Sequence, residues 1–388
     1  MTAARMSLTQ AQASAQSLAT GTAGAALLLI EQAMNRTGSW DSARARIRDA
    51  VAGPVDSGAH AGLYYGLPAI VFLLHTAAQG GQTVYRRAAD NLDTALLRLA
   101  GQRVTTATAR IRRGEAAAFA EYDLFYGLTG IATLLLHRRP SSGVLGDILT
   151  HLVELTRPRR DQGGLLPGWW VDHHPDPTLP TPGGHANFGM AHGTAGLLAL
   201  LALAAGRGLT VDGQHEAIER LLAWFDTWQQ DTPHGPWWPQ WITREQLATG
   251  RPAQPGPGRP SWCYGAVGIA RALQLAGIAT SNPTRQTAAE EALAACLTER
   301  QLDRLTEPGL CHGAAGVYQT AHRAAQDSTS PAIQQQLPAV AARLAGLTQS
   351  GAGAGRGLLT GDTGVSLAMA TAEQGPPQSG WDTCLLIT

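Results

Sequence analysis

The chain has 388 residues, of which 44% are hydrophobic and 15% charged, with 29 basic and 29 acidic side chains. This is enough for a sizeable core, and the balanced charge argues against a nucleic acid or a membrane surface as the partner. No apolar stretch is long enough to span a bilayer, and the first residues lack the pattern of a signal peptide. We therefore expect a cytoplasmic protein whose four cysteines stay as thiols or bind a metal.

A short motif recurs along the chain, in which a turn with the spacing G-x-x-G precedes an apolar helical run. Its first glycine falls at positions 21, 66, 127, 193, 265, 313 and 361, and the copy at 66 has Ala69 in place of the second glycine. Helices that are apolar on all sides are buried, so these runs predict an inner ring of helices. The amphipathic stretches between them, such as HEAIERLLAWFDTWQQ, predict an outer ring.

These repeats predict an all-α fold, a closed α/α toroid of about seven inner and seven outer helices that forms a single domain over residues 1–388. A closed ring needs no polar end repeats. The glycines have a structural explanation, because a missing side chain lets backbones approach closely where helix N-termini converge. We therefore expect no chemistry from the repeated motif itself.

Two Pro- and Gly-rich stretches interrupt the repeats, at residues 158–186 and 228–260. Long loops in a compact domain are often lids or small inserted subdomains. Their tryptophans have two interpretations, since they could contact a substrate or pin the loops to the helices: Trp169, Trp170, Trp237, Trp238 and Trp241. A shorter stretch at 349–359 is expected to link the last repeat to the others.

Reactive side chains replace small residues just before four of the inner helices. If these helices begin on one face of the ring, the residues there point toward a common centre: Asp123, His192, Cys263, Cys311 and His312. Two thiols and an imidazole are three ligands, the number that a catalytic zinc uses while it keeps a fourth position open. Thiolates also suit a zinc that activates another sulfur. The alternative for the two cysteines is a place in the core or a disulfide.

The segments YDLFYGLTG, NFGMAHGTAG, SWCYGAVG and LCHGAAG, together with the chain end WDTCLLIT, resemble the lanthionine synthetase C-like family. The resemblance runs through all seven repeats. It implies an α/α toroid and a zinc-dependent cyclase, which adds a peptide cysteine thiol to dehydroalanine or dehydrobutyrine and so forms lanthionine or methyllanthionine rings. It also implies one zinc per chain, with Cys263, Cys311 and His312 as ligands.

The resemblance further places the active-site residues of the family at His192, Asp123, Arg259 and Tyr264. In such a reaction the thiolate adds to Cβ and the Cα atom then needs a proton, a task that suits histidine. We assign this step to His192, with Asp123 orienting it and Arg259 or Tyr264 stabilising the enolate oxygen. For Asp123 a helix cap is an alternative, and for Arg259 a solvated loop position. Cys296 and Cys384 are expected to pack in the core.

The implied substrate is a dehydrated precursor peptide. Beside the toroid there is no room for a dehydratase, so a separate dehydratase is expected. The protein is expected to associate transiently with that dehydratase and with an exporter. This would bring it to the periphery of a membrane-bound complex. A monomer is expected because a closed ring buries its own core. The alternative function is a zinc-containing scaffold that binds cysteine peptides or glutathione without forming rings.

Overall fold

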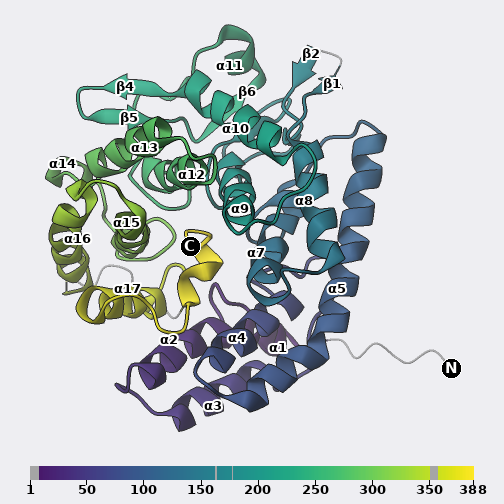
Figure 1. Ribbon diagram of the computed structural model, residues 1–388, viewed down its shortest axis with the longest axis vertical. Coiled ribbons are helices and arrows are strands. Elements are labelled where there is room, and N and C mark those ends of the chain that lie inside the picture. The colour runs from purple at the N-terminus through teal and green to yellow at the C-terminus, as the bar shows by residue number, and fades with distance from the viewer. Residues whose placement is uncertain (1–7, 162–163, 177, 350–356) are drawn as a thin grey trace.

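The computed structural model describes residues 8–161, 164–176, 178–349 and 357–388. Seven helices in these residues form an inner ring, and each begins directly after the first glycine of a repeat. They are α2 (Thr22–Met34), α4 (Leu67–Gln79), α7 (Leu128–Arg138), α9 (Thr194–Gly206), α12 (Ala266–Ala279), α15 (Ala314–Asp327) and α17 (Asp362–Gln374). Each contacts the next, and α17 returns to contact α2, so the ring is closed (Figure 1).

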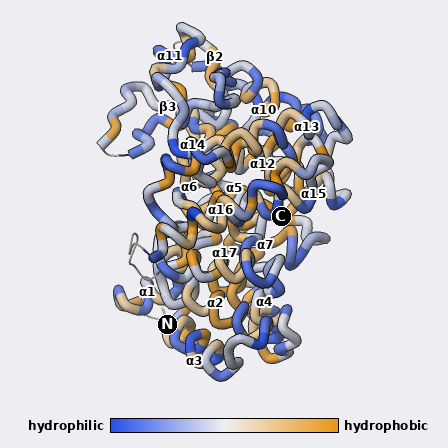
Figure 2. Tube along the Cα trace, turned by 90° about the vertical axis from the view of Figure 1, so that its left-hand side faces the viewer, coloured by the Kyte–Doolittle hydropathy of each residue, from blue (hydrophilic) through white to orange (hydrophobic). Residues whose placement is uncertain are grey.

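Outer helices follow six of the inner ones and pack against them. They are α3 (Trp40–Ala50), α5 (Thr83–Arg112), α8 (Gly143–Leu155), α10 (Gln214–Trp228), α13 (Pro283–Ala295) and α16 (Ala332–Gln349). Short helices complete the described chain: α1 (Gln10–Ala15), α6 (Phe119–Tyr122), α11 (Arg244–Thr249) and α14 (Glu299–Leu302). The predicted α/α toroid is confirmed. Figure 2 shows apolar residues concentrated in the interior and hydrophilic ones along the outside.

The second glycine of the repeat marks a close approach of two backbones. A Cβ atom added at Gly316 would overlap the carbonyl oxygen of Leu310, six residues earlier, and one at Gly364 would overlap that of Leu358. The repeat with Ala69 turns differently, since its Gly66 has a φ of 69°. These contacts support the structural explanation of the glycines.

A belt of backbone hydrogen bonds runs around the ring just before the inner helices. The residue two positions before the first glycine of a repeat donates to the carbonyl of its equivalent in a neighbouring repeat, over 2.8–3.3 Å: Tyr64 to Phe125, Ala191 to Cys263, Cys263 to Cys311, Cys311 to Leu359 and Leu359 to Ala19. Two further bonds complete the circle, from Leu18 to Tyr64 and from Leu124 to Ala191. Equivalent positions of adjacent repeats are therefore in contact.

The two interrupting stretches form a small layer at one side of the ring (Figure 1). Within the described residues, each contributes a two-stranded pair, and a third pair joins them: β1 (Arg159–Asp161) with β2 (Gly164–Leu166), β4 (Gln230–Thr232) with β5 (Gly235–Trp237), and β3 (His185–Asn187) with β6 (Trp241–Thr243). Four of the five tryptophans are buried and Trp241 is half-buried. Trp170 donates to the carbonyl of Gly183 and Trp238 to that of Phe225, so these side chains pin the layer in place.

The chain end lies in the middle of the ring (Figure 1). After α17 the chain turns inward into a short 3₁₀ helix, η1 (Trp381–Leu385), whose residues are buried. Of the linker predicted at 349–359, residues 350–356 lie outside the described part of the chain. Among the described residues, no helix combines the length and the apolar character that crossing a membrane requires.

Candidate metal and active site

Three potential metal ligands meet at the end of the ring where the inner helices begin. The Sγ atoms of Cys263 and Cys311 and a ring nitrogen of His312 lie within 4.8 Å of one another. Cys263 precedes α12, and the other two residues precede the adjacent helix α15. The backbone N–H of Cys263 donates to the carbonyl of Cys311 over 3.1 Å, which holds the two turns together. The belt thus brings together the three ligands that the sequence predicts.

The donor set of two sulfurs and one imidazole suits a soft divalent metal. The Cys263 sulfur accepts hydrogen bonds from Cys311 and His312, and these lower the pKa of its thiol well below the usual value although the side chain is buried. The pKa of Cys311 is raised, because the neighbouring Cys263 already carries the negative charge and because Cys311 is itself buried. All four cysteines are free, and burial raises the pKa of Cys296 and of Cys384 to about 12 in the core. Two sulfurs and one imidazole fit zinc, with a position left for a further ligand.

His192 and Asp123 form a hydrogen-bonded pair. His192 precedes α9 and Asp123 precedes α7, and Nδ1 of the histidine lies 2.6 Å from Oδ2 of the carboxylate. The other carboxylate oxygen accepts from the backbone N–H groups of Tyr126 at 2.7 Å and Gly127 at 2.8 Å. Because a carboxylate only accepts, the proton lies on Nδ1, and Nε2 is free to act on a substrate. Asp123 therefore orients His192 and at the same time binds the backbone of the turn that leads into α7.

Aromatic side chains hold the His192 ring on both faces. Phe119 and Phe125 stack on it with ring centroids 5.2 and 4.9 Å away. Trp262, which precedes Cys263, packs edge-on against Phe125. The sequence analysis missed both phenylalanines, although they flank Asp123 in the segment FAEYDLFYG.

Tyr264 lies between the metal ligands and the histidine. Its ring centroid is 6.1 Å from that of His192, and it follows Cys263 in the chain. Burial, together with the nearby Cys263, raises the pKa of its phenol well above the usual value, so it remains a hydrogen-bond donor.

Arg259 is not a free loop residue. Its NH1 atom lies 3.2 Å from Oε1 of Glu307, whose Oε2 lies 2.8 Å from Nε2 of His312. The sequence analysis missed Glu307, because it lies outside the repeated motif and nothing in its surroundings marks it. The structure thus connects Arg259 to His312 through a carboxylate.

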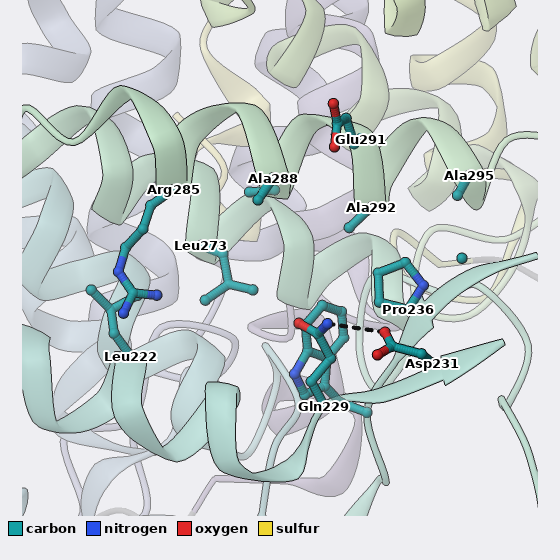
Figure 3. Close-up of a pocket in the computed structure, with 13 residues that line it drawn as sticks. Leu222, Gln229, Asp231, Pro236, Leu273, Arg285, Ala288, Glu291, Ala292 and Ala295 are labelled. Carbon is teal, nitrogen blue, oxygen red and sulfur yellow. Dashed lines mark hydrogen bonds between the residues drawn. The ribbon is translucent and has the colours of Figure 1, made fainter.

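A separate hollow of about 390 Å³ lies outside the ring, between α10, α13 and the β4–β5 pair (Figure 3). Apolar side chains such as Leu222 and Leu273 line it together with Asp231, Arg285 and Glu291. None of the predicted site residues lines it.

Comparisons with known proteins show the family and the fold of the chain. The family model for lanthionine synthetase C-like protein matches residues 12–386. The nisin biosynthesis protein NisC of Lactococcus lactis subsp. lactis is 22% identical over 276 residues, which are 69% of this chain and 64%, or less than two thirds, of that relative. A solved structure of nisin cyclase superposes with a TM-score of 0.81 at 20% identity, over 96% of this chain and 92% of that one, which shows a common fold. Since the family model spans almost its whole length, the chain belongs to the lanthionine synthetase C-like family.

Proposed function

We propose that the protein is a zinc-dependent cyclase, which adds peptide cysteine thiols to dehydroalanine or dehydrobutyrine and so forms lanthionine or methyllanthionine rings. The observation that carries the proposal is the set of Cys263, Cys311 and His312 in the same end of the ring as the hydrogen-bonded His192–Asp123 pair. Family membership supports it, and so does the likeness to a protein named nisin cyclase.

Cys263, Cys311 and His312 would hold the zinc. When bound, the metal would lower the pKa of a substrate thiol and keep it as a thiolate. Two sulfur ligands donate more charge than carboxylates, which favours a sulfur that remains nucleophilic.

The protein's own groups account for the proton. Addition forms a carbon–sulfur bond at Cβ, breaks the C=C π bond and leaves an enolate that takes a proton at Cα, while the thiol has lost one. His192 can do both transfers through Nε2, because Asp123 keeps Nδ1 protonated and stabilises the charged ring. Tyr264, held in its protonated form, can donate to the enolate oxygen. Arg259 is engaged by Glu307 and is the weaker candidate for that contact.

The proposed substrate is a dehydrated precursor peptide, so a separate dehydratase must act first. We also propose that the protein associates with that enzyme and with an exporter, at the periphery of a membrane complex. We propose that it is a monomer. A scaffold that only binds cysteine peptides or glutathione is the second candidate. A zinc site alone would serve it, whereas the oriented pair of His192 and Asp123 is what a proton transfer requires.

The test begins with zinc content and ends with cyclisation. Purified protein, Cys311→Ala and the control Cys296→Ala are analysed for zinc; about one zinc is expected in the parent and the control, and almost none in Cys311→Ala. The parent is then mixed with a peptide that carries one dehydroalanine and one cysteine, and the free thiol is followed by alkylation and mass spectrometry. A folded parent that takes up no added zinc under reducing conditions contradicts the proposal. Zinc binding with a thiol that is held but never consumed favours the scaffold.

A further inference from the structure

We propose that Glu307 is a positioning residue for the metal site, which selects the ring nitrogen that His312 offers to the metal and is itself held by Arg259. This inference rests on the proposed zinc site. Oε2 of Glu307 lies 2.8 Å from Nε2 of His312, and Oε1 lies 3.2 Å from NH1 of Arg259. One carboxylate therefore bridges a ligand of the site and a cation from a different loop.

The backbone fixes Glu307 beside the helix that carries His312. The carbonyl of Glu307 accepts from the N–H of Ala314, the first residue of α15, over 3.0 Å. A Cβ atom at Gly313 would overlap that same carbonyl. The glycine thus permits the close approach, and the side chain of Glu307 starts from a fixed point near the imidazole.

Hydrogen bonding to Glu307 decides which nitrogen of His312 can bind a metal. A carboxylate only accepts, so Nε2 must carry a proton, and Nδ1 is then the nitrogen that donates to Cys263 and that would exchange its proton for the metal. A carboxylate on the far nitrogen also fixes the ring orientation and makes the ligand more basic, and such partners commonly contribute 10–100-fold to metal affinity. Glu307 therefore prepares His312 as an Nδ1 ligand before any metal arrives.

Arg259 balances the charge of this arrangement. Two thiolates and Glu307 carry three negative charges, and a divalent cation with Arg259 carries three positive ones. The side chains of Arg259 and Glu307 are 41% and 45% exposed, so the attraction between them is modest. The proposal gives Arg259 a role that acts through Glu307 and His312, in place of direct contact with an enolate.

Zinc affinity tests the proposal without any turnover. The parent, Glu307→Ala, Glu307→Gln and the control Glu299→Gln, an exposed glutamate, are titrated with zinc in competition with a chromophoric chelator at fixed pH. We expect Glu307→Ala to bind about 10–100-fold more weakly. Glu307→Gln, whose amide oxygen still accepts from Nε2, should lose less, and the control should match the parent.

Cobalt substitution adds a readout that a merely structural role would not change. The sulfur-to-cobalt charge-transfer bands should persist in Glu307→Ala because both thiolates remain, while the ligand-field bands shift as the imidazole loses its fixed orientation. Parental zinc affinity and parental cobalt bands in a folded Glu307→Ala variant would overturn the inference and leave the proposed function intact. A parent that binds no zinc would overturn both.

Discussion

Nδ1 of His192 lies 2.6 Å from Oδ2 of Asp123, while Oδ1 of the same carboxylate accepts two backbone N–H groups in the turn just before α7. The aspartate thus joins the turn before one inner helix to the residue that precedes the next. A helix cap and an orienting role were the two alternatives for Asp123. The carboxylate contacts His192, and its other oxygen binds the turn before α7 instead of the N–H groups of the helix itself. This combination allows the two contributions to be separated by mutation.

Asp123→Asn should abolish most activity and leave the fold stable. The amide oxygen can keep the two hydrogen bonds to the turn before α7, but then the NH₂ group faces Nδ1 of His192 and donates to it. The histidine proton must move to Nε2, so the ring has the wrong tautomer to accept a proton there. We expect the rate of thioether formation to fall by about 10²–10⁴-fold in single-turnover assays, with zinc content unchanged.

Asp123→Ala provides the comparison, since it also removes the acceptor of the two backbone N–H groups before α7. It should lose activity to a similar extent and also lower the free energy of unfolding by about 1–3 kcal/mol, because those N–H groups lose their partner. Parental cyclisation rates in Asp123→Asn would show that Asp123 does not act through the tautomer of His192.

The meeting of the three proposed metal ligands was predictable because the repeats share one register. Cys263 and Cys311 stand two residues before their first glycines, and the belt turns this equivalence into contact through the hydrogen bond from one backbone to the other. The same argument predicted that His192 would lie near the same end of the ring. Positions that occur in every repeat are thus placed by the sequence pattern alone.

Residues outside the shared register could not be placed in this way. Glu307 lies in a connecting loop, and its contact with His312 depends on how that loop folds back on α15. Phe119 belongs to the short helix α6, which has no counterpart in the repeat. The path of the chain end into the ring also depends on interactions with several inner helices at once, which no local pattern reports.

The second glycine of a repeat should be intolerant of any side chain. Gly364→Ala would drive a methyl group into the carbonyl oxygen of Leu358, so we expect the free energy of unfolding to fall by about 3 kcal/mol. Gly101→Ala is the control, because it lies inside α5 with open space around it and should stabilise the helix by about 0.5–1 kcal/mol. Urea denaturation measures both. Equal effects of the two substitutions would contradict the close-approach explanation.

Acid should destabilise the protein through His137. Burial, with a further contribution from the nearby Arg207, lowers the pKa of His137 from 6.5 to about 4, although the backbone carbonyl of Thr133 opposes the shift. The Nε2 atom lies 2.6 Å from NH2 of Arg207 and acts as the acceptor, so protonation would set two cations face to face. The unfolded chain binds this proton more readily, so the stability that neutral His137 contributes is present above pH 6.5 and is lost as the pH falls toward 4.

The measurement compares the parent with His137→Gln, whose amide oxygen can still accept from Arg207. Urea denaturation at pH 7.5 and pH 4.5 is carried out with a metal chelator present, so that proton competition for the metal site does not contribute. We expect the parent to lose about 2 kcal/mol more than the variant over this interval. Parallel pH profiles would exclude His137 as a source of the acid sensitivity.

The buried carboxylate of Asp382 should be one of the most important polar groups for stability. It lies in η1 at the centre of the ring, fully buried, where it accepts from Nε2 of Gln319 at 2.7 Å and from Nε and NH2 of Arg323 at 2.6 and 2.8 Å. Beyond it the chain end stays attached, because Trp262 donates to the carbonyl of Leu385 over 2.9 Å. Asp382 thus joins α15 to the segment that fills the ring.

Asp382→Ala would leave Arg323, of which only 15% of the side chain is exposed, without its partner. Breaking a buried ion pair on one side costs more than the pair contributes, because the remaining charge stays desolvated. We expect a loss of about 3 kcal/mol in urea denaturation. Asp303→Ala, with a side chain that is 69% exposed and 3.9 Å from Arg343, should change stability by less than about 0.5 kcal/mol. A comparable loss in both variants would mean that the burial of Asp382 does not add to its contribution to stability. A large loss in Asp382→Ala alone would identify the chain end as part of what holds the ring closed.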